Sequence, residues 1–588
     1  MILRIKYTLL ISFLLIPNCF AQVTDKIEIS GNKVFSSEEI LRWSGIRKGQ
    51  PFNPALIDSA ISGISFNLVQ YGYHHPDLNG VTFQISEDST LANIFISVNE
   101  GKPTIINEIY FVESDSLIVS ELTRSLNYLK GQVLIKNEME LRINNILNEY
   151  ENKGYPFINV IIRSINIFTD SITDLHSADV YLKIDKGAES KIDKVEIIGN
   201  TSTKDQVILR ELRISQGEMY SQQMIEEFPR RLNRLRYFEP VSTPQYYFNS
   251  LNEGVLLITV KERQTNNFDG VIGYIPPRSE EEKGYLTGLV NISLRNLFGT
   301  GRAAALRWQQ FDRNSQVLEL KYLEPWLLGY PFNINLLLNQ RKQDTTYVHR
   351  KIEGGLEYLA TEDISAAVFV ATESVIPTER TIPVFTVYNS SVLTSGISFR
   401  IDTRDDPFAP TAGLIFNTAY AFSQKKINGP KEYLSPTVKT DINLQRITVG
   451  INVYYEIFQR QVLALGLTGK ELRGSDFENS DLFRLGGTMS LRGYREEQFL
   501  GSRIFWSNFE FRSLLTRRSY AFVFFDTGYY LRNEEPDHLI AKQEDFKIGY
   551  GLGLSLETGL GILAVSFALG EGDSFSDGKI HFGIINEF

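Results

Sequence analysis

From about Asn266 to its C-terminus, the sequence alternates apolar residues with polar or small ones. Between positions 546 and 556 the even-numbered residues are Phe, Ile, Tyr or Leu, whereas the odd-numbered residues are Lys, Gly or Ser. A β-strand points successive side chains to opposite faces, so this period of two predicts a strand with one apolar face. The same alternation occurs in Leu286–Arg295, Phe505–Arg512 and Lys579–Phe588. Because helical periodicity is almost absent from this half, we expect it to be all-β.

The N-terminus predicts export. Two basic residues precede a short apolar stretch, Tyr7–Ile16, and Ala21 ends a segment typical of a cleaved secretory signal peptide. We therefore expect residues 1–21 to be a signal peptide; the alternative is a lipoprotein signal acylated at Cys19. No later apolar run approaches the ~18 residues of a membrane helix. Since only helices and closed barrels satisfy their backbones in lipid, the mature chain is either soluble or a β-barrel.

Export together with the strand pattern favours a transmembrane barrel. Outer-membrane barrels contain alternating segments of about 10 residues and girdles of aromatic side chains, and their strand number is usually even. At about 20 residues per strand and turn, residues 264–588 hold about 16 antiparallel strands. A soluble β-sandwich would also alternate, and this alternative stays open at this point.

The first half contains three similar α+β units, expected at residues 22–101, 102–188 and 189–263. Each reads as strand, two helical stretches and two further strands, a β-α-α-β-β order. A repeat of this length indicates an array of supersecondary units. The first and third units share a Gly-Asn turn, at Gly31 and Gly199, which the second unit lacks. The alternative is a chance recurrence of a common α+β pattern.

Composition excludes several classes of function for this chain of 588 residues. A net charge of −10 argues against general nucleic-acid binding. A single cysteine allows neither a disulfide framework nor a thiolate zinc site, and the six histidines are scattered. Nucleophile-elbow, zinc-protease and phosphate-loop motifs are also missing from the sequence. We expect neither an enzyme nor a metal or cofactor site.

Domain order and several short motifs give this sequence a resemblance to the BamA/TamA-type family of outer-membrane insertases and translocators, whose periplasmic units are called POTRA domains. Each motif is weak alone, and their order and spacing strengthen the match. The matching segments are Asn296–Arg302, Asp402–Gly413, Leu491-Arg492-Gly493-Tyr494, Phe525-Asp526-Thr527-Gly528 (whose first Phe could be Phe524), and a terminal strand with His581, Gly583 and Phe588.

The resemblance implies a place in the bacterial outer membrane, with the POTRA-like units in the periplasm and the barrel in the lipid bilayer. It implies insertion or translocation of client outer-membrane or surface polypeptides. It also implies that the POTRA-like units bind periplasmic chaperones, or an inner-membrane or lipoprotein partner. Three units favour a TamA-like or accessory role. The alternative is a two-partner-secretion transporter for one cognate polypeptide, although such transporters usually carry two periplasmic units and a plug helix.

Arg492 is the main candidate for a structural charge inside the barrel. An arginine folded into a barrel lumen needs carboxylates, because burying its charge unpaired is too costly. Glu510 faces the polar side of its strand and Asp526 lies on the next strand, and the resemblance implies this same trio. The face that Asp526 occupies stays open, because residues 522–525 are all apolar. Alternatively, Arg492 is a solvated loop residue.

The resemblance also implies functional roles for further residues of these motifs. Leu491, Gly493 and Tyr494 form the tip of the loop, and Phe525, Asp526 and Gly528 form the strand motif. By contrast, the charges of Asp402, Arg404 and Asp405 read as ordinary rim charges.

A weak seam is expected where the first barrel strand meets the last. The first strand includes Phe268–Ile275, carries Gly270 and Gly273, and is followed by Pro276-Pro277; glycine weakens a strand and proline cannot donate to its ladder. The last strand contributes Phe582, Gly583 and Phe588. Unpaired strand edges template another strand, so such a seam could admit a client polypeptide. The alternative is complete closure, with these residues forming a turn.

Overall fold

The computed structural model describes residues 22–112, 119, 122–124, 126–169, 175–275, 284–310, 312–344, 346–378, 387–429, 439–474, 476–534, 541–558 and 561–585. The expected signal peptide, the Pro276-Pro277 pair and Phe588 lie outside these residues. The chain divides into two compact units. The first comprises Met1–Val195, Ser215–Glu226 and Tyr246–Leu256, and the second comprises Glu196–Ile214, Glu227–Gln245 and Leu257–Phe588.

The first repeat has the expected β-α-α-β-β order. Its elements are β1 (Val23–Ser30), α1 (Ser37–Ser44), α2 (Ala55–Gln70), β2 (Asp77–Ile85) and β3 (Leu91–Asn99). The sheet order is β1-β3-β2, with β1 parallel and β2 antiparallel to the central β3. Helix α2 buries Ile57, Ala60, Ile64 and Leu68, which follow a helical spacing and give the repeat a core of its own.

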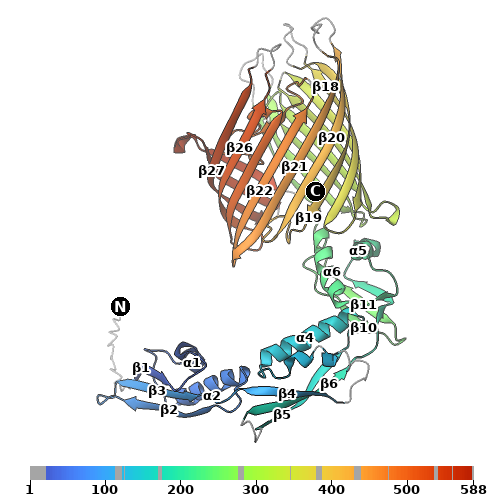
Figure 1. Cartoon of the computed structure of the whole chain (residues 1–588). Helices are drawn as coiled ribbons and strands as arrows, with labels where there is room; N and C mark the ends of the chain where they lie inside the picture. The colour runs from blue at the N-terminus through green and yellow to red at the C-terminus, as the bar shows by residue number, and fades with distance from the viewer. Residues whose placement is uncertain are drawn as a thin grey trace, which may run out of the picture. The chain divides into compact units, whose positions relative to one another are not determined.

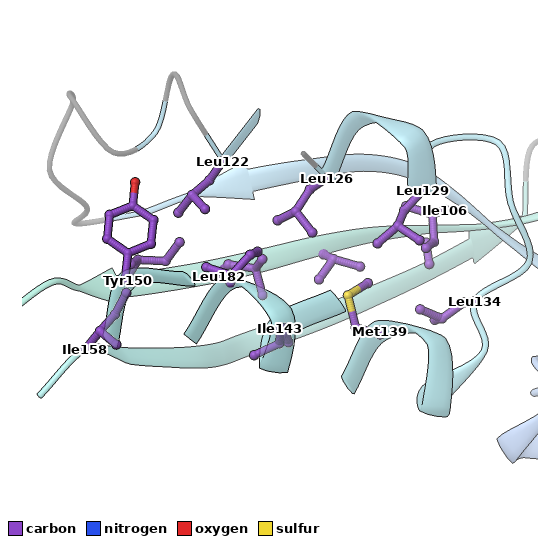
Figure 2. Close-up of a cluster of buried hydrophobic side chains, with 14 residues drawn as sticks. Ile106, Leu122, Leu126, Leu129, Leu134, Met139, Ile143, Tyr150, Ile158 and Leu182 are labelled. Atoms are coloured by element: carbon purple, nitrogen blue, oxygen red, sulfur yellow. The ribbon is translucent and has the colours of Figure 1, made fainter. Parts of the chain in front are cut away.

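The second repeat has the same sheet order. Its elements are β4 (Thr104–Phe111), the 3-10 turn η1 (Asn127–Leu129), α4 (Lys136–Asn152), β5 (Asn159–Thr169) and β6 (His176–Asp185). The strand order β4-β6-β5 leaves β5 at the sheet edge. Helix α4 places Met139, Ile143, Ile146 and Tyr150 in the buried cluster that Figure 2 shows between the helices and the sheet. This repeat therefore also has its own core.

The third repeat contains shorter strands. Its elements are β7 (Lys191–Ile192), β8 (Lys194–Ile198), α5 (Asp205–Leu212), β9 (Glu218–Met219), α6 (Gln222–Leu235), β10 (Gln245–Phe248) and β11 (Gly254–Thr259). Strands β10, β11 and β8 form its main sheet, in that order. Helix α5 and the second half of α6 belong to the same compact unit as the barrel.

The Gly-Asn turn shared by the first and third repeats has a steric cause. Gly31 and Gly199 both adopt positive φ, 83° and 96°. A Cβ atom at Gly31 would lie 2.7 Å from the carbonyl oxygen of Val98, and one at Gly199 would lie 1.9 Å from that of Val260. Only glycine fits both the conformation and the space.

A glutamate at the end of each of these repeats closes the same turn. Glu100 accepts hydrogen bonds from the backbone N–H groups of Lys33 and Val34, at 2.7 and 3.0 Å. Glu262 accepts bonds from those of Ser202 and Thr203, at 2.9 and 2.6 Å. Burial raises the pKa of Glu262, but hydrogen bonds from the 201–203 turn outweigh burial and lower it to about 2.

The C-terminal region is one 16-stranded antiparallel sheet that curls into a barrel (Figure 1). The even strand number equals the number expected from the length of this region. Its strands in order are β12 (Asn267–Ile275), β13 (Tyr285–Leu297), β14 (Arg302–Gln310), β15 (Gln316–Glu324), β16 (Phe332–Gln343), β17 (Tyr347–Leu359), β18 (Ile364–Pro377), β19 (Asn389–Asp402), β20 (Gly413–Gly429), β21 (Asp441–Phe458), β22 (Gln461–Arg473), β25 (Arg503–Leu514), β26 (Tyr520–Arg532), β27 (Gln543–Thr558), β28 (Gly561–Gly570) and β29 (Lys579–Ile585).

The two faces of the barrel wall differ as the alternation predicts. On β27, Phe546 and Leu552 are 53% and 59% exposed and point outward, whereas Gly549 and Gly553 are buried on the inner face. The exposed apolar side chains suit contact with lipid. Within the described ranges, no helix is long and apolar enough to cross a membrane.

The Glu262 contact predicts a pH-dependent turn in the third repeat. Because the pKa of Glu262 is lowered in the folded state, its stabilising effect is complete above its ordinary value of 4.5 and is lost as the pH falls toward about 2. Hydrogen exchange of residues 200–212, corrected for the intrinsic effect of pH, should therefore accelerate over this window. Glu262→Gln should exchange faster at neutral pH and lose this pH dependence. An unchanged profile in the variant would contradict the assignment.

The separate cores predict that residues 22–188 fold without the rest of the chain. Each of these two repeats buries its own apolar cluster, so neither depends on the barrel for its core. The fragment should be soluble and should show mixed α/β circular dichroism with a cooperative thermal transition. An insoluble fragment, or one without helical signal, would show that the repeat boundaries at 101 and 188 are misplaced.

Candidate functional site

A long segment between β22 and β25 folds back into the barrel, and we call residues 476–502 the inner loop. Within it, β23 (Phe483–Leu485) pairs with β24 (Phe499–Gly501). The inner loop contacts inward-facing side chains on β16, β20, β26 and β29, which lie far apart around the sheet. It therefore occupies the barrel lumen.

Arg492 is the centre of the main contact between the inner loop and the wall. Its Nε and Nη2 donate to the two carboxylate oxygens of Asp526, at 2.7 and 2.8 Å, and its Nη1 donates to Glu510 at 2.6 Å. The backbone N–H of Arg492 also donates to Asp526, at 3.1 Å. Arg492 is 6% exposed and Asp526 is fully buried. The planar guanidinium thus makes a bidentate pair with one carboxylate and a single bond to the other.

Strand register explains why these two carboxylates meet. Glu510 pairs with Phe524 across β25 and β26, so Asp526 lies two positions further along the same inner face. Phe524 is 5% exposed whereas Phe525 is 45% exposed. The sequence left open which face of the strand Asp526 occupies. In the structure Phe524, Asp526 and Gly528 lie on the inner face, and Phe525 points outward. The guanidinium carbon of Arg492 lies 3.7 Å from the centroid of the Phe524 ring, which adds a cation–π contact.

Glycines on the wall make room for the loop backbone. A Cβ atom at Gly549 would lie 1.9 Å from the carbonyl oxygen of Arg492, and one at Gly528 would lie 2.8 Å from Leu491. On the loop side, Gly493 has a φ of 92°, and a Cβ there would lie 2.6 Å from the carbonyl oxygen of Leu569. Any larger side chain at these positions would push the loop off the wall.

The tip of the inner loop also contacts the end of the barrel sheet. The Tyr494 hydroxyl donates to the carbonyl oxygen of Ile548 on β27, at 2.9 Å. The N–H of Gly493 lies 3.1 Å from Nε2 of His581 on β29. A Cβ atom at Gly583, two residues further along β29, would lie 3.6 Å from the side chain of Thr488 in the loop. The loop therefore reaches the last strand of the sheet.

Two other ion clusters fix the inner loop to the opposite wall. Lys425 on β20 donates to Glu478 and Asp481 of the loop, at 2.6 and 2.5 Å, and its side chain is fully buried. Arg341 on β16 donates to Glu497, at 2.5 Å. We did not identify these residues from the sequence. The available signal was a basic residue at an inward position of each strand, opposite acidic residues of a long loop.

The predicted seam residues lie on the two terminal strands of the sheet. Gly270 faces the backbone of β13, since a Cβ there would lie 2.7 Å from the carbonyl oxygen of Leu289, and Gly273 pairs with Thr287. Phe582 on β29 is 62% exposed. In the described parts of the two strands, β12 pairs with β13, β29 pairs with β28, and no pairing joins β12 to β29.

The charged groups of the lumen have a mechanical role in this arrangement. They hold the inner loop against the barrel wall, and their hydrogen-bond donors and acceptors are largely paired with one another. Over the ranges that the structure describes, no group of three or more His, Cys, Asp or Glu side chains could hold a metal ion.

Comparison with family models divides the chain as the architecture does. Residues 296–588 match the Omp85 superfamily domain. Residues 23–101 and 190–263 match the POTRA model, described as a surface antigen variable number repeat. The second repeat, which lacks the Gly-Asn turn, lies between these two matches.

Curated relatives and a solved structure agree with these models. The outer membrane protein assembly factor BamA of Neisseria meningitidis is 26% identical over 303 residues, which cover 49% of this chain and 36% of that protein. That of Nitratidesulfovibrio vulgaris is 24% identical over 618 residues, which cover 95% of this chain and 72% of that protein. The crystal structure of BamA from Haemophilus ducreyi lacking POTRA domains 1–3 matches with a TM-score of 0.50 and 16% identity, over 81% of this chain and 98% of that chain. This last likeness concerns the fold alone.

The burial of Arg492 predicts a large effect of its removal. Arg492→Ala leaves two carboxylates without their cation, and breaking a buried pair costs roughly 3–5 kcal/mol. The variant should cleave faster with trypsin at the exposed Arg495 of the inner loop and should unfold at lower urea concentration in detergent. The matched control is Arg503→Ala on β25, whose side chain is 59% exposed, so that its pair with Glu471 should contribute only ~0–1 kcal/mol. Equal behaviour of the two variants would show that the Arg492 cluster does not hold the loop.

Proposed function

Because the chain belongs to the BamA/TamA-type family of the Omp85 superfamily, with its barrel in the outer membrane and its POTRA repeats in the periplasm, we propose that it inserts or exports client polypeptides through a lateral seam between β12 and β29. The clients are outer-membrane β-barrel or surface polypeptides. The activity makes and breaks no covalent bond and uses no metal or cofactor. Its physical basis is the exchange of strand pairing at the seam.

The observation that carries this proposal is the pairing of the two terminal strands. Each has a partner on one side only in the described residues. A free edge presents unpaired N–H and C=O groups, which template an incoming strand. In lipid an unpaired backbone group costs several kcal/mol, so an edge of this kind favours a partner strand strongly. Gly270 and Gly273 weaken the packing of β12 further.

The inner loop supports the proposal because it holds the wall on one side of the seam. Arg492 binds β25 and β26, and Gly493 contacts His581 on β29 itself. These contacts fix the C-terminal side of the seam from inside the barrel. We infer that the loop keeps β29 in position while the edge of β12 exchanges partners.

The second POTRA repeat offers a further edge for polypeptides in the periplasm. Strand β5 is the edge strand of its sheet, and nearly all of its residues are exposed on both faces. Its exposed apolar side chains include Ile161, Ile165 and Phe168, each about two-fifths exposed. An extended client segment, a chaperone or a membrane-anchored partner could add a strand here through main-chain hydrogen bonds.

Depletion of the protein tests the breadth of the proposed activity. The general assembly function predicts that several outer-membrane proteins decrease together when this protein is depleted, as measured by quantitative proteomics of the outer membrane. Loss of one surface polypeptide alone would instead indicate a dedicated transporter. An unchanged outer-membrane proteome would contradict both.

Cross-linking of the seam tests the mechanism. Cysteine pairs between positions 268–274 of β12 and 579–583 of β29 should be scanned for a register that forms a disulfide. Oxidation of that pair should stop client insertion, because the strands can no longer separate, and reduction should restore it. The matched control joins Tyr274 and Leu286, which are already partners in the β12–β13 ladder, and should leave insertion unchanged. Full activity with a verified β12–β29 disulfide would contradict lateral opening.

A further inference from the structure

The turn between β19 and β20, residues 403–412, is held together by hydrogen bonds among its own residues. Arg404 and Asp406 are each 9% exposed. The guanidinium of Arg404 donates to Asp402 and to the carbonyl oxygen of Pro407. Asp405 accepts from the backbone and hydroxyl of Thr411, at 2.9 and 2.6 Å. The charges of Asp402, Arg404 and Asp405, which were expected to be ordinary rim charges, are thus hydrogen-bonded within the turn.

One side of this turn contacts residues 227–245 of the third POTRA repeat, which belong to the same compact unit as the barrel. Arg236, just beyond α6, places its guanidinium carbon 3.9 Å from the centroid of the Phe408 ring and is 8% exposed. Arg234 on α6 donates to the carbonyl oxygen of Asp402, at 2.5 Å. Two arginines of the repeat therefore hold the turn in place.

The other side of the same turn contacts the wall that carries Arg492. Asp406 accepts from Arg518 in the β25–β26 turn, at 2.7 Å. Ala409 is 1% exposed and packs in a buried cluster with Tyr520, Phe522 and Phe524 of β26. The turn therefore bridges the repeat to the inner face of β26, far along the sheet from β19 and β20.

The aromatic side chains under Ala409 are the ones that support Arg492. Phe524 lies 3.7 Å below its guanidinium carbon and Phe522 lies 5.7 Å from it. An unbroken set of contacts therefore leads from Arg236 through Phe408 and Ala409 to Arg492. Packed contacts of this kind can carry energetic coupling between two sites.

We propose that the β19–β20 turn couples the third POTRA repeat to the inner loop, with Phe408 as the positioning residue. Loss of the contact between Arg236 and Phe408 shifts the turn, loosens the aromatic ladder of β26 and weakens the hold on Arg492. A movement of the repeat is thereby transmitted to the loop. This coupling goes beyond the proposed function, because it holds or fails whether or not the seam opens.

The test measures release of the inner loop in variants of residues that do not contact the loop. In the full-length protein in detergent, trypsin cleavage at Arg495 reports release of the inner loop. Arg236→Ala and Phe408→Ala should each raise the cleavage rate by about fivefold or more. The double variant should be no faster than the faster single variant, because both changes remove the same contact. Heat-modifiable migration in gels shows that the barrel is folded in each sample.

The matched control is Phe298→Ala, which removes the same side chain from the β13–β14 turn, where it is 83% exposed. It should leave the cleavage rate unchanged. If Phe408→Ala fails to fold, Arg236→Gln carries the test, since it leaves every barrel residue in place. Unchanged cleavage in the Arg236 variants, or additive effects of the two alanine substitutions, would overturn the proposal.

Discussion

The buried pairing of Arg492 with Asp526 and Glu510 is the interaction on which the barrel interior depends. Burial of a guanidinium without partners would cost several kcal/mol of free energy. The loop can therefore place Arg492 in the lumen only where carboxylates pair with it. Their positions follow from the register of β25 and β26. The contact also explains the glycines around these carboxylates. A guanidinium held this close brings the loop backbone into contact with the wall, which leaves no room for a side chain.

Patterns in the sequence predicted most of the architecture. Alternation, the export signal and the repeated α+β order indicated a barrel of about 16 strands after three periplasmic units, and the structure has this arrangement. The face of Asp526 could not be predicted, because the residues before it are apolar on both faces of the strand. The outer ones face lipid, and the inner ones are aromatic side chains beside Arg492. Alternation fails as a signal wherever both faces of a strand are apolar.

Residues that act across the fold were also beyond the sequence. Lys425 and Arg341 were not singled out in the sequence, and only closure of the sheet brings them to the inner loop. The turn at Asp402–Gly413 was recognised as a motif, and its charges were interpreted as ordinary rim charges. Some of its hydrogen bonds join residues close in sequence, whereas its bond to Arg518 and its packing against β26 join residues more than a hundred positions apart.

The glutamate that ends the first repeat, and the one that ends the third, each bind back to the opening turn of the same repeat. In each of these repeats, a glutamate near the C-terminal end therefore accepts hydrogen bonds from backbone N–H groups of the opening turn. An in-frame duplication or deletion of such a repeat would carry the opening turn and its glutamate together, so these N–H groups would keep their acceptor. This pairing inside the repeat removes one structural obstacle to a change in the number of repeats.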